Sequence, residues 1–170
     1  GLLPANKTVL KFLDEMTNKI GISKTVRIWL SEKVESPLTI GFLKPLIILP
    51  VAALGQLTYE QAKAVIAHEL FHIKRNDYLL NLLMMVAEVI LFFNPFARIL
   101  FETVKKEREN SCDDQVLAIG FDAWDYSQTL YILGRYRSRH NELAIAATGK
   151  GKQFLLQRVR RLMNRNTASP

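Results

Sequence analysis

The chain has 170 residues, of which 49% are hydrophobic, and this length suits one domain with a substantial core. Its single cysteine, Cys112, excludes an internal disulfide, so the fold must depend on packing and on any bound metal. The formal net charge of +7 is compatible with nucleic acid or anionic lipid as a partner. No nucleic-acid-binding motif accompanies that charge, and we therefore expect no nucleic-acid partner.

The first third of the chain is predicted to contain one helix and a small sheet. Apolar residues recur at helical spacing over residues 7–20, and Gly21 stands where a C-terminal glycine cap is expected. Three short runs typical of strands follow, separated by proline-containing breaks, at residues 26–30, 38–42 and 46–49.

The rest of the chain is predicted to be helical. Thr58 and Gln61 form a capping box that begins a helix over residues 58–76. An apolar stretch over residues 78–93 follows, and Asn94-Pro95 then restarts a helix that ends near residue 120. Two further helices are predicted, at residues 122–137 and, as a short basic amphipathic segment, at residues 154–163.

The motif H-E-x-x-H occurs at residues 68–72, inside the predicted helix 58–76. Residues four apart lie on one helix face, so His68 and His72 can offer two imidazoles to one metal ion. Glu69, beside them, is the candidate general base that activates a water for attack. We therefore expect a Zn²⁺ site, although two surface histidines on a helix are an alternative interpretation.

A catalytic zinc site takes three protein ligands, so another ligand must lie elsewhere. Six residues after His72 the chain has Tyr78 and twenty residues after it Phe92, which excludes two common positions. His140 lies beyond the predicted helices, where exposure is more typical. Residues 78–93 would rise about 24 Å as a helix and residues 95–109 about 22 Å. A hairpin at Asn94-Pro95 would therefore return Glu109 to the metal-binding helix.

Asp113 lies one helical turn beyond Glu109, close enough to accept a hydrogen bond from a ligand histidine and to orient its ring. The alternative is that Glu109 and Asp113 form a solvated acidic patch among neighbouring basic residues. Cys112, between them, is predicted to pack in the core and not to act as a nucleophile or ligand.

Four segments, together with their order along most of the chain, resemble a known family. They are residues 36–50, residues 67–77 reading A-H-E-L-F-H-I-K-R-N-D, residues 93–96 reading F-N-P-F, and residues 109–113 reading E-N-S-C-D. In these segments the chain resembles the peptidase domain of the BlaR/MecR-type antibiotic-sensor transducers and their bacterial relatives. Full-length members have flanking transmembrane helices, and the sensors add an extracellular ligand-binding domain. This chain shows no such sensor domain, so the resemblance does not imply antibiotic sensing.

The resemblance implies a membrane-bound gluzincin whose third zinc ligand is the glutamate of the last segment, which falls on Glu109. The expected fold is α+β, with a small mixed or antiparallel sheet packed on a mostly helical, zincin-like domain over residues 1–170. We expect this domain to be part of a larger membrane protein. The expected function is zinc-dependent endopeptidase activity on a protein or peptide, regulatory or self-cleaving in membrane signal transduction. A non-catalytic zinc-binding scaffold is the alternative.

Residues 78–97 contain one charge, Glu88, and are apolar enough to interact with a bilayer. A complete crossing would carry Glu109 to the opposite side from His68 and His72. We therefore expect half of a helical hairpin, buried in the domain or dipped into the bilayer surface. Positive side chains would then share the cytoplasmic face of the membrane, namely Lys74, Arg75, Arg98, Lys105 and Lys106.

Peptidases of the resembled class hold the substrate backbone beside an edge strand. We expect residues 38–42 to be this edge strand. The run lies between two prolines, and prolines are tolerated at strand ends and on edge strands. The expected substrate strand thus comprises Thr39, Ile40, Gly41 and Phe42, although Gly41 is equally compatible with an ordinary turn, and residues 26–30 are the alternative edge. The donor for the oxyanion is open among Tyr126, Tyr131 and His140.

Overall fold

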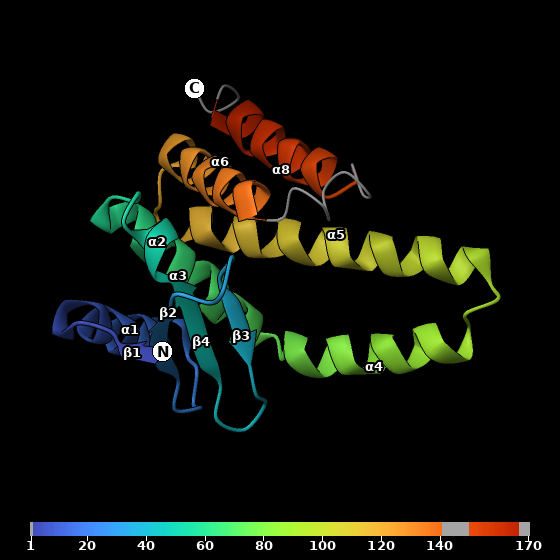
Figure 1. The fold of residues 1–170 in the computed structure, drawn as a ribbon, viewed down its shortest axis with the longest axis horizontal. Helices are drawn as coiled ribbons and strands as arrows, with labels where there is room; N and C mark the ends of the chain where they lie inside the picture. Colours follow the sequence, from blue (N-terminus) through green and yellow to red (C-terminus); the bar gives the residue numbers. More distant parts are fainter. Residues whose placement is uncertain (1, 141–149, 167–170) are drawn as a thin grey trace.

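The computed structural model describes residues 2–140 and 150–166 and has an α+β fold (Figure 1). Four strands form one mixed sheet: β1 (Leu2–Pro4), β2 (Arg27–Ser31), β3 (Leu38–Ile40) and β4 (Leu46–Pro50). The described residues also form seven helices: α1 (Lys7–Ile20), α2 (Val51–Leu54), α3 (Tyr59–Lys74), α4 (Asp77–Ile90), α5 (Pro95–Ala118), α6 (Ala123–His140) and α8 (Lys150–Asn166). The α+β class and the mixed sheet agree with the prediction.

The strand order β1-β2-β4-β3 places β3 at an edge of the sheet. β2 and β4 are parallel, whereas β1 pairs with β2 and β3 pairs with β4 in antiparallel fashion. β1 was not predicted, because three residues are too few for a periodic signal. Its pairing places β2 between two neighbours, which excludes β2 as the alternative edge for a substrate.

The predicted strand over residues 38–42 is too long, because β3 ends at Ile40. Gly41 has a φ of 85°, and a Cβ built there would lie 3.1 Å from the carbonyl oxygen of Lys44. Positive φ and this close approach suit glycine in a turn. Gly41 and Phe42 therefore belong to the turn between β3 and β4 and not to the strand, which corrects the predicted substrate strand at those two positions.

The predicted helix caps are present. The Thr58 side chain accepts from the amide of Gln61 at 3.2 Å, and the Gln61 side chain accepts from the amide of Thr58 at 3.0 Å. Asn94 caps α5 with Pro95 at its start, and Gly21 ends α1 in the left-handed conformation. These local hydrogen bonds satisfy the free backbone groups at helix ends, which is why they are readable from sequence.

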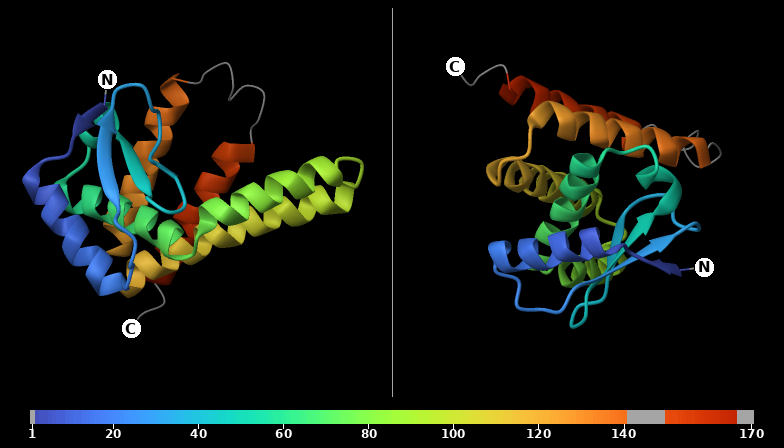
Figure 2. Two further views of the ribbon diagram at one scale, coloured as in Figure 1. Left: turned by 90° about the horizontal axis from the view of Figure 1, so that it is seen from below. Right: turned by 90° about the vertical axis from the view of Figure 1, so that its left-hand side faces the viewer.

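Helices α4 and α5 form the predicted hairpin, which projects from the body of the domain (Figure 1 and the left view of Figure 2). The hairpin returns α5 to α3, so Glu109 lies beside the H-E-x-x-H helix. In the described part of the chain, no helix has both the length and the apolar character needed to cross a membrane.

The core joins the sheet to the helices that carry the metal-binding motif. Its buried side chains come from α1, β2, β4, α3, α5, α6 and α8. The inner residues of α3, including Ile66, Ala67 and Leu70, are at most 1% exposed. Close packing on several sides holds α3 rigidly, and its functional side chains emerge from that support.

Candidate metal centre

Three side chains from two helices meet at one point: His68 and His72 from α3 and Glu109 from α5. The Nε2 atoms of the two histidines are 3.1 Å apart. Oε2 of Glu109 is 3.5 Å from Nε2 of His68, and Oε1 of Glu109 is 3.5 Å from Nε2 of His72. The structure thus brings together the three residues that were predicted as metal ligands.

This geometry fits a tetrahedral zinc ion. Zinc bonds of about 2.0–2.1 Å would separate neighbouring ligand atoms in a tetrahedron by about 3.3 Å. The 3.1 Å between the two Nε2 atoms is close to that value, and each Nε2 atom has a different oxygen of Glu109 at 3.5 Å. The Glu109 side chain is 29% exposed and the His72 side chain 15%, so solvent can reach this group of donors. Two imidazoles and one carboxylate with an open fourth position are the donor set of catalytic zinc sites.

The ring of His72 is held by Asp77, a residue that the sequence analysis missed. Oδ2 of Asp77 lies 2.6 Å from Nδ1 of His72, so Nδ1–H donates and the Nε2 lone pair faces the centre. Burial disfavours the charged carboxylate, but the bond from His72 and the charges of Arg108 and Arg75 lower the pKa of Asp77. Asn76 has a φ of 58° and makes the sharp turn that brings Asp77 back to His72.

The ring of His68 is held through Tyr126 and Asp113. The Tyr126 hydroxyl donates to Oδ1 of Asp113 at 2.7 Å, so it accepts from Nδ1–H of His68, 2.8 Å away. Asp113 itself lies 3.4 Å from that nitrogen. The predicted role of Asp113 beside a ligand histidine is therefore supplied largely through the tyrosine hydroxyl. With both Nδ1 atoms donating, the two Nε2 atoms face each other at 3.1 Å, so they can share either a proton or a metal ion.

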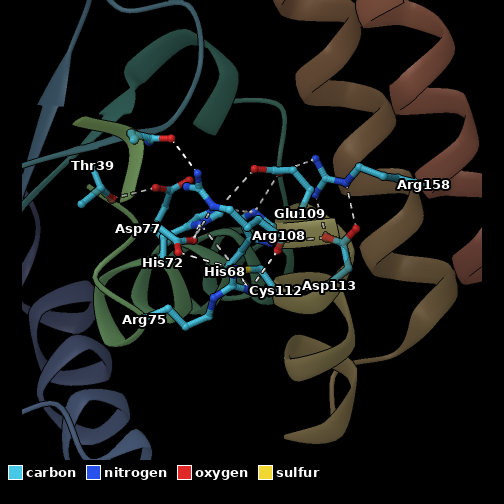
Figure 3. A network of polar contacts seen from close by, with 12 residues as sticks. Thr39, His68, His72, Arg75, Asp77, Arg108, Glu109, Cys112, Asp113 and Arg158 are labelled. Atoms are coloured by element: carbon cyan, nitrogen blue, oxygen red, sulfur yellow. Dashed lines mark hydrogen bonds and ion pairs between the residues drawn. The ribbon is translucent and has the colours of Figure 1, made fainter. Parts of the chain in front are cut away.

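Arg158 of α8 closes the far side of the centre and was also missed from sequence (Figure 3). Its guanidinium donates to both oxygens of Asp113, at 2.8 and 2.6 Å, and lies 2.8 Å from Oε2 of Glu109. Burial disfavours the charged form of Glu109, but His68 and Arg158 together lower the pKa of that carboxyl to about 2. Glu109 is therefore anionic, with one oxygen held by Arg158 and Oε1 available to a metal.

A second group of donors, His72, Asp77 and Cys112, also lies close together but fits a metal poorly. Its histidine nitrogen is Nδ1, which already donates to Asp77. Burial raises the pKa of the Cys112 thiol to about 12, whereas a metal ligand must be a thiolate. Cys112 is fully buried in the core, as expected from sequence.

Glu69, the candidate base, is held by the edge strand. Oγ1 of Thr39 in β3 donates to Oε2 of Glu69 at 2.7 Å. The buried α3 and the edge of the sheet therefore orient this carboxylate from two sides. Thr39 was predicted only as a backbone contact for substrate, and its side-chain role became visible in the structure.

The three candidate donors for an oxyanion are not equivalent. The Tyr126 side chain is 1% exposed, and its hydroxyl is occupied by Asp113 and His68. Tyr131 is 51% exposed and lies near Arg135. His140 is the last residue of α6, and its side chain lies outside the described part. Tyr126 therefore supports the histidine, and the oxyanion donor stays open.

Comparison with known proteins agrees with this geometry. The family described as BlaR1 peptidase M56 matches residues 4–162. Over 169 residues, 97% of this chain, the sequence is 29% identical to regulatory protein BlaR1 of Bacillus licheniformis, and it covers 28% of that protein. Over 96 residues, 56% of this chain, it is 31% identical to the methicillin resistance mecR1 protein of Staphylococcus aureus, covering 16% of that protein. The resemblance inferred from the four segments is thus confirmed: the chain belongs to the BlaR1 peptidase M56 family.

Proposed function

We propose that residues 1–170 form one zincin-like metallopeptidase domain that hydrolyses peptide bonds with Zn²⁺ as its cofactor. The observation that carries this proposal is the convergence of His68, His72 and Glu109 at distances that suit one metal ion, with Glu69 next to His68 in the chain. Membership of a peptidase family supports it. Bound zinc supplies Lewis acidity, which polarises a peptide carbonyl and lowers the pKa of a water at the site.

The residues of this chain supply the proton transfers. Glu69 accepts the proton of the attacking water and then donates it to the leaving amine, so no covalent intermediate with the protein is needed. Thr39 donates to Oε2 of Glu69, which limits the rotation of this carboxylate during the proton transfers. Arg158 and Asp77 keep Glu109 and His72 in their ligand orientations, because each contacts a ligand side chain at 2.8 Å or less.

The substrate is proposed to be an extended protein or peptide segment that pairs with β3. This strand has β4 on one side and no other strand of the described residues on its other side, and Thr39 within it donates to Glu69. An edge strand offers main-chain donors and acceptors that position a scissile bond whatever its side chains. The relevant backbone is that of Thr39 and Ile40, since Gly41 and Phe42 belong to the turn.

A regulatory role at the cytoplasmic face of a membrane, next to flanking transmembrane helices, is part of the proposal. It rests on the similarity to proteins named as regulatory protein BlaR1 and on the basic residues around the hairpin.

The test combines zinc analysis with a cleavage assay. Purified wild-type chain should contain stoichiometric zinc and cleave itself or a peptide library, as seen by mass spectrometry. Glu69→Gln should retain zinc but lose hydrolysis, whereas Glu109→Ala should lose both. Stoichiometric zinc in Glu109→Ala would show that the third ligand is wrong. Zinc without hydrolysis in the wild-type chain would favour the non-catalytic scaffold.

A further inference from the structure

The outer surface of the α4–α5 hairpin is apolar and uncovered. Of the 25 large hydrophobic side chains that are exposed in the described part of the chain, 15 lie between Tyr78 and Leu100. The most exposed are at the turn, where Phe92, Phe93 and Phe96 are 84%, 71% and 79% exposed. The turn is also the point of the hairpin farthest from the sheet (Figures 1 and 2). The apolar surface is therefore one continuous projection.

The polarity of this hairpin is inverted relative to a helix pair in water. The polar side chains of α4 face α5, where Asn81 accepts from Arg108 at 2.6 Å and Glu88 accepts from Lys105 at 3.0 Å. Met84 is the one apolar residue of α4 that is buried. The exposed apolar residues of α4 cover roughly 220° of the helix circumference at 100° per residue. A water-soluble helix turns its apolar stripe inward, so this surface is suited to an apolar surrounding.

A bilayer fits this surface better than a protein groove does. A helix that docks in a groove presents a narrow stripe at i, i+3, i+4 and i+7, whereas the exposed arc of α4 is far wider. Two of the exposed acidic groups are paired, Glu88 with Lys105 and Glu102 with Arg98, while Glu107 is also exposed; the basic side chains along α5 are Arg98, Lys105 and Lys106. Anionic lipid headgroups complement such basic residues.

We infer that the tip of the α4–α5 hairpin inserts into one leaflet of an anionic lipid bilayer. α4 has 14 residues and is about 21 Å long, shorter than the hydrocarbon core of about 30 Å, so the hairpin enters without crossing. Arg98 lies one turn from the tip with its side chain 81% exposed, and its long stem reaches the headgroups. The hairpin therefore enters obliquely, with α4 deeper than α5.

This contact places the candidate metal centre near the membrane surface. His72 and Glu109 lie at the base of the hairpin, since α4 begins at Asp77, which contacts His72. Membrane binding does not depend on hydrolysis and stands even if the site only holds zinc.

The experiment measures binding of the 170-residue chain to vesicles by co-sedimentation. One set of vesicles contains phosphatidylglycerol and phosphatidylcholine, and the other contains phosphatidylcholine alone. The test variant is Val89→Glu/Phe93→Glu, at positions 70% and 71% exposed, where a charge does not disturb the core. The matched control is Leu43→Glu, which is 78% exposed in the β3–β4 turn. Circular dichroism and zinc content confirm that each variant is folded.

The wild-type chain should bind the anionic vesicles, and the hairpin variant should lose about tenfold or more of its partition coefficient while Leu43→Glu changes little. A fluorophore attached to the thiol introduced by Phe93→Cys should shift its emission to shorter wavelength with vesicles, and buried Cys112 should stay unlabelled. Failure to bind vesicles, or equal binding by the hairpin variant, would overturn the inference. Self-association abolished by the hairpin variant, without vesicle binding, would assign the surface to a second copy of the chain instead.

Discussion

Arg158→Met is expected to destabilise the metal-free protein strongly, because it removes the counter-charge of two carboxylates. Asp113 is fully buried and accepts hydrogen bonds of 2.8 and 2.6 Å from Arg158, and Glu109 contacts the same guanidinium at 2.8 Å. The pKa of Asp113 is lowered far below its ordinary value: burial opposes this shift, but the bonds from His68 and Arg158 outweigh it. Loss of Arg158 removes one of the two groups that compensate the burial of this carboxylate, so its charge becomes costly to keep in the folded protein.

Removal of one partner of a buried ion pair typically costs about 3–5 kcal/mol. For a domain of this size each 1 kcal/mol corresponds to about 2–4 °C, so the midpoint of thermal unfolding should fall by about 6–20 °C. Urea and thermal unfolding, followed by circular dichroism after EDTA treatment, measure both quantities. Arg160→Met is the matched control, since Arg160 is exposed on the same helix and its loss should change the free energy of unfolding by at most about 0.5 kcal/mol.

The double variant Arg158→Met/Asp113→Asn tests the cause of the effect. If the cost arises from an unpaired buried charge, the neutral amide should restore part of the stability lost in Arg158→Met. A loss below about 1 kcal/mol in Arg158→Met would refute the reasoning, because such a value is typical of an exposed ion pair. Strictly additive losses in the double variant would also refute it.

Three further predictions concern the surroundings of the metal centre. Asp77→Asn should weaken zinc binding by about 10–100-fold in competition with a chromogenic chelator, since the amide orients His72 less strongly; an unchanged affinity would show that the ring is held by packing alone. Thr39→Val should retain zinc while kcat falls by about tenfold or more, because Glu69 loses a hydrogen bond to its charged form. Loss of zinc in that variant would instead point to misfolding. Burial raises the pKa of the Cys112 thiol to about 12, so a disulfide reagent at neutral pH should modify it only after denaturation; rapid modification of the folded protein would contradict this.

Local chemistry explains why part of this molecule could be predicted. The capping box at Thr58 and the cap at Asn94 are made within three residues, so their sequence patterns identify the helix starts directly. The i, i+4 spacing places His68 and His72 on one face of any helix. The return of Glu109 to α3 was predictable as well, because helical rise is constant and the break at Asn94-Pro95 divides two segments of similar length.

The sequence alone did not reveal the residues that hold the metal ligands in place. Asp77 reaches His72 only because Asn76 adopts a left-handed conformation, and asparagine does not require that conformation. Arg158 and Tyr126 come from helices that pack against α3 and α5, and nothing in their spacing distinguishes them from other arginines and tyrosines. Hydrogen bonds between residues 45 or 58 positions apart depend on the packing of whole elements, which local patterns do not encode.

The sheet illustrates the same limit. Short strand-like runs and proline breaks indicated β2, β3 and β4, but the order β1-β2-β4-β3 follows from long-range pairing. Only that order makes β3 an edge strand and excludes β2 as the alternative edge for a substrate. The turn at Gly41 is likewise decided by its φ of 85° and by the nearby carbonyl of Lys44. Short-range periodicity and capping in the sequence therefore determined which residues carry the chemistry. Tertiary packing decided which side chains orient those residues, which neutralise their charge and which residues stay accessible.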